Sequence, residues 1–171
     1  MAGAPARRSL CAIIIFKHMN SEEIIWKPHV TVAAVAEDQG CFLLVEEYID
    51  GKVVLNQPAG HLEERENLLT AVIRETLEET AWHFRPEALV GLYRWRQPDR
   101  GSTYLRFTFC GSCTGHDPAR PLDADIERAL WLSPREIRQQ EANLRSPMVL
   151  RSIEDYLGGH TYPLSLLNDV T

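Results

Sequence analysis

The sequence predicts an α/β fold, and three observations support this expectation. Residues 67–80 carry apolar side chains at helical intervals and predict one long amphipathic helix. Runs rich in β-branched and aromatic residues lie on both sides of that helix. The chain has 171 residues, of which 44% are hydrophobic and 25% charged, so its size and composition suit one globular domain.

The predicted strands are short and are separated by turn signals. The first two flank the turn-forming residues 37–40 and predict a hairpin that carries the rest of the fold. Residues 55–58 are expected to be extended just before the helical region. The remaining strands are expected from periodicity and β propensity, and the full set covers residues 29–36, 42–48, 89–96, 104–109 and 129–132.

The long helix is expected to begin after Asn67, whose side chain can accept a backbone N–H at the first turn. Its apolar stripe is expected to pack on the core and comprises Leu69, Val72, Ile73, Thr76 and Leu77.

Two shorter helices are predicted near the C-terminus. Ser133, Pro134 and Glu136 match an N-cap, a first helical position and a capping-box partner. A second helix is expected within 146–158, because serine and proline open this segment and glycine closes it.

Three glutamates occupy the helix face opposite the apolar stripe. Glu75, Glu78 and Glu79 stand at positions i, i+3 and i+4, so their side chains rise close together from one face. Like charges at this spacing repel, whereas a hard cation with oxygen ligands turns the cluster into a binding site. The pattern therefore favours magnesium or manganese, although three glutamates alone also fit an ordinary charged surface helix.

These glutamates belong to a longer pattern of fixed spacings. Gly60 is followed after five residues by Glu66, and after seven more by the run RETLEE, which ends at Glu79. Residues 60–82 resemble the Nudix box, whose pattern is G, five residues, E, seven residues and REUxEExGU, with U an aliphatic residue. The second glycine of the pattern is replaced by Ala81, where a left-handed backbone is expected and alanine costs about 1 kcal/mol.

The resemblance extends beyond the box to the Nudix phosphatases. It rests on the segments WKPHVTV, NQPAGHLE, LRF, NLRSP and YPL, and covers nearly everything from Trp26 to the C-terminus. It implies one Nudix domain over 26–171, an α/β/α sandwich around a mixed sheet. It also implies a small Mg²⁺-dependent phosphohydrolase, with Mn²⁺ as a substitute, that releases orthophosphate from nucleoside di- and triphosphates. Hydroxymethylpyrimidine pyrophosphate, a thiamine precursor, is a further implied substrate.

Hydrolysis of a phosphoanhydride needs a cation that screens the phosphate charge and a carboxylate that takes a proton from water. We expect Glu78 and Glu79 to bind the metal directly, together with the backbone carbonyl of Gly60. Glu75 is expected to be either a third ligand or the general base. The resemblance gives Arg74 a structural role, pairing with box glutamates including Glu66, and direct substrate contact is the alternative.

Four residues outside these positions are candidate substrate contacts. Gln57 and His61 flank the turn that precedes the box helix, where phosphate contact and loop hydrogen bonds are equally compatible. Arg106 lies on a predicted strand and suits phosphate recognition or a structural ion pair. Trp95 can stack on a base or pyrimidine ring, although aromatic residues in strands more often belong to the core.

The net charge of −6 and the pI near 5.5 argue against a nucleic-acid partner, which would need a basic stripe. A small phosphorylated substrate needs only local positive charge. Four cysteines in a chain without a convincing secretory signal indicate reduced thiols and a cytoplasmic protein. We also expect a monomer without membrane association.

The N-terminal residues 1–25 are expected to be an extension of the domain. The apolar run 10–16 is at the short limit for a signal peptide and far below the length of a membrane helix. One hypothesis is that residues 1–18 precede an original start at Met19, and the alternative is an extra edge strand at 11–16.

Two other function classes stay open. The first is another Nudix enzyme, one that cleaves dinucleoside polyphosphates or RNA 5′-triphosphates. The second is a binding module that has lost catalysis, which the three retained box glutamates disfavour.

Overall fold

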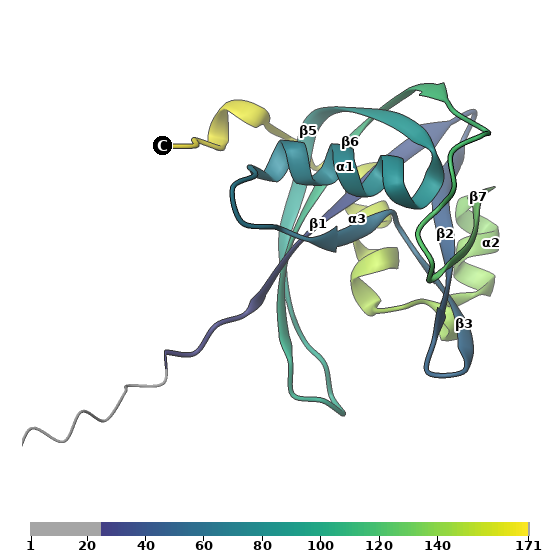
Figure 1. The fold of residues 1–171 in the computed structure, drawn as a ribbon, viewed down its shortest axis with the longest axis horizontal. Helices are drawn as coiled ribbons and strands as arrows, with labels where there is room; N and C mark the ends of the chain where they lie inside the picture. Colours follow the sequence, from purple (N-terminus) through teal and green to yellow (C-terminus); the bar gives the residue numbers. More distant parts are fainter. Residues whose placement is uncertain (1–24, 171) are drawn as a thin grey trace, which may run out of the picture.

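The computed structural model describes residues 25–170 and consists of a mixed β-sheet with helices on both faces (Figure 1). The elements follow the order β1 (His29–Asp38), β2 (Cys41–Ile49), β3 (Lys52–Asn56), β4 (Ala59–His61), α1 (Leu68–Thr80), β5 (Trp82–Arg96), β6 (Thr103–His116), β7 (Ile126–Leu132), α2 (Pro134–Gln139), η1 (Glu141–Asn143), α3 (Pro147–Leu157), β8 (Tyr162–Pro163) and η2 (Leu164–Leu166).

Strand β1 is the centre of the sheet, whose main order is β3-β2-β1-β6-β5-β8. It runs parallel to β6, whereas its pairs with β2 and β4 are antiparallel. Strand β7 lies outside this main order and pairs antiparallel with β2. The sheet is therefore mixed, and β4 brings the start of the box directly against β1.

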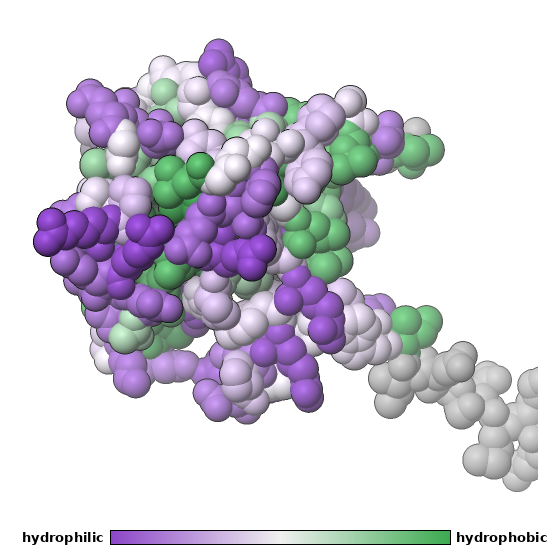
Figure 2. Space-filling view, turned by 180° about the vertical axis from the view of Figure 1, so that it is seen from behind, coloured by the Kyte–Doolittle hydropathy of each residue, from purple (hydrophilic) through white to green (hydrophobic). Residues whose placement is uncertain are grey.

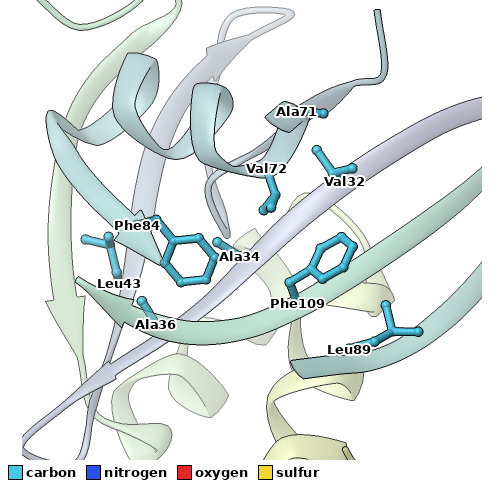
Figure 3. Packing of buried hydrophobic residues seen from close by; sticks show 9 residues of the cluster. All are labelled: Val32, Ala34, Ala36, Leu43, Ala71, Val72, Phe84, Leu89 and Phe109. Carbon is cyan, nitrogen blue, oxygen red and sulfur yellow. The ribbon is translucent and has the colours of Figure 1, made fainter. Parts of the chain in front are cut away.

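Two apolar clusters cover the two faces of the sheet. Alternate residues of β1 point to opposite sides, so Val32 and Ala34 meet α1 while Val35 meets α3. Figure 3 shows the α1 side, where Val72 lies above β1 close to Phe109. Helices α2 and α3 supply Ile137, Val149 and Ile153 to the second cluster. This arrangement confirms the predicted α/β/α sandwich.

Helix α1 confirms the predicted box helix, including both of its ends. The Asn67 side chain accepts the backbone N–H of Thr70 at 2.9 Å, and Ala81 follows the helix at φ +58°, in the left-handed region. The expected apolar stripe is wrong at Ile73, which is 39% exposed. Its place in the buried face is taken by Ala71, which packs on the sheet.

Strand β5 begins at Trp82, well before the predicted 89–96. Residues 82–88 were not predicted as a strand, because the proline at position 86 disfavours a central strand. In the structure Pro86 lies beside a register shift, and β8 pairs with β5 only from Ala88 onwards. Strand β6, which pairs with β5, is also longer than the predicted 104–109, because it covers Thr103–His116. Its Gly111 lies so close to the carbonyl of Arg85 that a Cβ atom would come within 2.1 Å.

Strand β3 begins at Lys52 and not within the predicted 55–58. Asp50 and Gly51 both have positive φ, at +51° and +80°, and form a tight hairpin turn between β2 and β3. The aspartate-glycine pair is a sequence signal for such a turn. The predicted helices near the C-terminus are present, and Ser133 and Glu136 form the expected capping box.

The expectations for residues 1–18, including an edge strand at 11–16, lie outside the described residues. Within residues 25–170, no helix is long and apolar enough to cross a membrane. The face seen from behind in Figure 2 mixes hydrophilic and apolar residues. Cys41, Cys110 and Cys113 are free thiols, and burial raises the pKa of Cys113 to about 11.

Candidate active site

A cavity of about 390 Å³ opens beside the N-terminal loop of the box. One wall comes from the box itself, with β4 and the last turn of α1. The other wall comes from β1, β2, β3, β5 and β6, from residues 123–126 and from the residues that lead into α3. The two walls will be called the box wall and the sheet wall.

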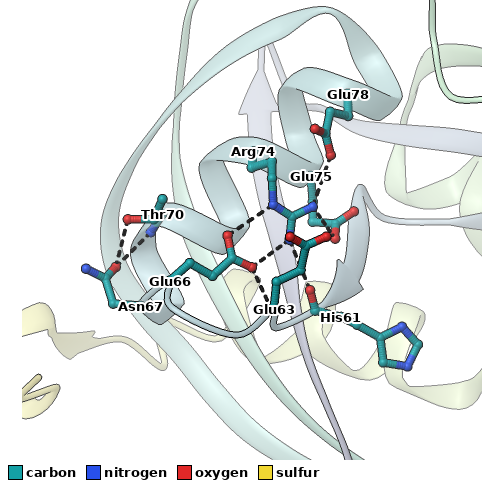
Figure 4. Close-up of polar contacts among 8 residues, drawn as sticks. All are labelled: His61, Glu63, Glu66, Asn67, Thr70, Arg74, Glu75 and Glu78. Atoms are coloured by element: carbon teal, nitrogen blue, oxygen red, sulfur yellow. Dashed lines mark hydrogen bonds and ion pairs between the residues drawn. The ribbon is translucent and has the colours of Figure 1, made fainter.

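Arg74 organises the box wall through three carboxylates (Figure 4). Its guanidinium is 2.7 Å from Glu66, 2.8 Å from Glu75 and 3.0 Å from Glu78, and it also donates to the carbonyl of His61 at 3.1 Å. The hydrogen bond with Glu66 is the largest cause of the raised pKa of Arg74 and of the lowered pKa of Glu66. The arginine therefore ties the loop to the helix, which is the structural role that the resemblance implies for it.

Glu75 and Glu79 are not on a solvated helix face. Each is only 8% exposed, because β4 packs against this side of α1. The Glu75 carboxyl fills the space beside Gly60, where any Cβ atom would lie within 2.2 Å of it. Glu79 accepts the backbone N–H of Ala59 at 2.8 Å. The expectation of a polar outer face is therefore wrong for these two side chains, since the sheet and the loop cover them.

The buried carboxyl of Glu79 has few positively charged neighbours. Burial raises the pKa of Glu79 to about 9, and the neighbouring carboxylates of Glu47, Glu75 and Asp123 raise it further. Burial also raises the pKa of Glu75, although its bond with Arg74 opposes this effect. Such carboxylates lose proton affinity when a cation binds beside them.

The donor set on the box wall fits a divalent metal ion. Among residues 25–170, no three acidic, histidine or cysteine side chains already converge on one point, and Arg74 engages Glu75 and Glu78. The available donors are nevertheless carboxylate oxygens and the Gly60 backbone, which hard cations prefer. Glu75, Glu78, Glu79 and the Gly60 carbonyl are the groups that would hold the ion.

The sheet wall is built around a buried arginine. Arg106 is 6% exposed, and its closest polar contact is a long bond of 3.4 Å to the Asn56 side chain. Asn56 in turn donates to the buried carboxylate of Glu47 at 2.7 Å, and Arg145 lies 3.6 Å from the same carboxylate. Burial lowers the pKa of Arg106 to about 10, so it stays protonated at neutral pH.

Aromatic rings form one end of the cavity. Trp95 and His61 both line it, in agreement with their selection from the sequence as candidate contacts. Trp95 stacks on Tyr104 with ring centroids 5.8 Å apart, and Tyr104 stacks on His29 at 5.1 Å. His61 meets the edge of this row, 5.4 Å from His29. The row spans four strands, and its stacked part comprises Trp95, Tyr104 and His29.

Gln57 does not reach the cavity, and its predicted substrate contact is therefore wrong in this structure. The side chain is 1% exposed and donates to the Ser152 hydroxyl at 2.7 Å and to the Val149 carbonyl at 3.3 Å. Gln57 thus fixes the loop before the box to α3.

Sequence reasoning did not select several cavity residues. Glu47 and Asn56 belong to strands whose apolar character dominated the pattern, and Asp123 belongs to a loop without a motif. The signal available for Glu47 was a charged residue at an inward position of an apolar strand. Arg145 also lines the cavity, and it lies in an irregular segment just before the last helix.

Comparisons with known proteins identify the family of this chain. Residues 26–152 match the family model described as the NUDIX domain. The phosphatase NudJ of Escherichia coli K12 is 45% identical over 145 residues, which cover 85% of this chain and 94% of the relative. A Nudix hydrolase from Nitrosomonas europaea has a TM-score of 0.83 and 51% identity, over 84% of this chain and 98% of its own.

A more distant structure shares the fold alone. The Nudix domain of Shewanella oneidensis NrtR, solved with ADP-ribose, has a TM-score of 0.63 and 17% identity, over 77% of this chain and 90% of its own. Nudix hydrolases generally use divalent metal ions. The family match and the phosphatase relative show that this chain belongs to the Nudix family and is a hydrolase that acts on phosphoanhydride bonds.

Proposed function

We propose that this chain is a Mg²⁺-dependent phosphatase that releases orthophosphate from nucleoside di- and triphosphates and from hydroxymethylpyrimidine pyrophosphate. The observation that carries the proposal is one cavity lined by Glu79 of the box, by the buried Arg106 and by the stacked rings of Trp95 and Tyr104. This arrangement suits a substrate with a flat ring at one end and a short phosphate chain at the other. NudJ, with 45% identity, is named as a phosphatase, which supports the same activity.

The box wall supplies the chemistry at phosphorus. Magnesium bound by Glu75, Glu78, Glu79 and the Gly60 carbonyl would screen the charge of the phosphate chain. Glu75 is the candidate general base, because its carboxyl lies beside Gly60 and Arg74 keeps it in place. In that role a Glu75 oxygen takes a proton from the attacking water. The alternative is that Glu75 serves only as a ligand.

The sheet wall and the aromatic row hold the substrate. Arg106 is charged, buried and poorly paired, so a phosphate oxygen offers it a better partner than Asn56 does. Trp95 presents a ring to a base or pyrimidine, since its other face is supported by Tyr104. His61 lies between the aromatic row and the box wall, within reach of the phosphates.

Product analysis tests this proposal. The full chain is incubated with ATP, ADP, hydroxymethylpyrimidine pyrophosphate or a dinucleoside polyphosphate, with and without magnesium, and the products are separated. The phosphatase predicts orthophosphate and a product shortened by one phosphate. Pyrophosphate release, or a mononucleotide from a dinucleoside polyphosphate, would instead favour another Nudix pyrophosphohydrolase.

The same screen addresses the remaining class. A binding module would retain affinity for a nucleotide without turnover at any metal concentration. We also propose that the protein is a cytoplasmic monomer. It has no nucleic-acid partner in this proposal, because the formal net charge is −6 and the cavity is sized for a small ligand. Light scattering measures the oligomeric state.

A further inference from the structure

Three residues of the cavity carry buried polar atoms that have no hydrogen-bond partner within residues 25–170. They are the Thr31 hydroxyl, the Nε of Arg106 and the Ser146 hydroxyl, on side chains that are 4%, 6% and 5% exposed. Thr31 and Arg106 are directly paired across β1 and β6. Buried polar groups almost always have partners, so three such groups around one cavity indicate a ligand that supplies acceptors.

Ser146 is the most informative of the three. It is the N-cap residue of α3, an 11-residue helix, but its side chain makes no capping hydrogen bond. A serine at this position normally caps the helix, and here the hydroxyl remains available to a ligand. The positive end of the helix dipole also favours an anion at this place.

Arg145 extends the same group of donors. Its backbone N–H donates to the Leu55 carbonyl at 2.8 Å, and Leu144 forms a parallel bridge with Leu55. The backbone before α3 is therefore fixed to the edge of β3. The Arg145 side chain stays 3.6 Å from Glu47, beyond a good hydrogen bond, and can turn to a stronger acceptor.

We propose that Arg106, Arg145 and Ser146, with Thr31 beside them, form a subsite for a tetrahedral phosphate group. All four present donors, which matches the acceptor-only oxygens of a phosphate dianion. The inference rests on the proposed function and deepens it, because the subsite would hold the phosphate that is released as orthophosphate. Inorganic phosphate then binds there as a product.

The carboxylates in the cavity define the conditions of the test. Glu47, Glu79, Asp123 and Asp125 also line it and repel a phosphate dianion when no cation is present. Glu47 is partly offset by its bond from Asn56. The subsite is therefore measured in magnesium, with inorganic phosphate as the probe.

Calorimetry with inorganic phosphate and the full chain tests the subsite. Arg145→Gln is expected to weaken phosphate binding about tenfold, and Ser146→Ala about threefold, as charged and neutral hydrogen bonds differ. Arg94→Gln changes the charge equally at an exposed position of β5 and should leave phosphate binding unchanged. Because Ser146 does not cap α3, Ser146→Ala should also leave the thermal midpoint unchanged.

The opposite result would overturn the subsite. The subsite is rejected if neither variant changes phosphate binding. It is also rejected if Ser146→Ala lowers the thermal midpoint and leaves phosphate binding unchanged. Ser146 would then be a structural cap and Arg145 a surface residue. The proposed function has separate outcomes. Release of orthophosphate by Arg145→Gln with unaltered phosphate affinity rejects the subsite alone, whereas pyrophosphate as product rejects the phosphatase alone.

Discussion

The two walls of the cavity contrast in how the chain builds them. The box wall comes from one continuous segment, in which Arg74 binds three carboxylates and the loop at once. The sheet wall is assembled from strands and a helix far apart in the sequence, and its arginine is left with one long hydrogen bond. The first wall is rigid and acidic, and the second is poised to gain a partner.

This contrast implies a division of labour between the walls. Groups that act on the transition state change kcat, whereas groups that hold substrate and transition state equally change KM. We expect the box wall to set kcat, because its carboxylates lie where the metal and the attacking water are needed. The sheet wall is expected to set KM, because its donors contact phosphate throughout the reaction.

Removal of divalent metal is expected to have the largest effect. Excess chelator should abolish phosphate release, because the reaction needs a cation that screens the charge of the phosphate chain. Restored magnesium should also stabilise the fold, by about 2.7 kcal/mol at a hundredfold excess over Kd. Thermal unfolding with and without the ion measures this. A fold that gains no stability from either magnesium or manganese would contradict a metal site on the box wall.

Glu79→Gln is expected to lower kcat by about 10²–10³-fold, as loss of one preorganised charge does. The glutamine can still accept the N–H of Ala59, so circular dichroism should show a folded protein. Glu64→Gln, at an exposed position of the loop before α1, is the matched control and should retain full turnover. Magnesium-dependent turnover at the normal rate in Glu79→Gln would remove this residue from the site.

The difference between the walls also explains what the sequence could predict. The box helix, its Asn67 cap and its metal-binding glutamates depend on spacings within a few turns of chain, which are visible in one dimension. The partners of Arg106 depend on strand register, which brings Asn56 and Glu47 together only in the folded sheet. Gln57 was misjudged for the same reason, since its bond to Ser152 spans the domain.

Arg106→Lys tests the sheet wall with a smaller expected effect. Lysine keeps the charge but loses the planar fork, so KM should rise about tenfold, or about 1.4 kcal/mol, while kcat changes much less. The control is Arg94→Lys on the exposed side of β5, which should alter neither constant. Steady-state kinetics separates the two terms. If kcat falls with unchanged KM, Arg106 acts on the transition state, and the division between the walls does not hold.

Ala81→Gly is expected to have the smallest effect, although it restores the glycine of the family pattern. Glycine at φ +58° relieves about 1 kcal/mol of left-handed strain, but it removes a methyl group that is 2% exposed, worth about 0.8 kcal/mol. The two terms nearly cancel, so urea unfolding should show a change below about 0.5 kcal/mol. Turnover should also stay unchanged, because Ala81 touches neither wall.

Ala81→Val supplies the contrast, since a β-branched side chain adds strain at this φ and should destabilise the fold by more than about 1 kcal/mol. A gain above about 1.5 kcal/mol in Ala81→Gly would mean that the departure from the family pattern strains the end of α1 more than the buried methyl compensates.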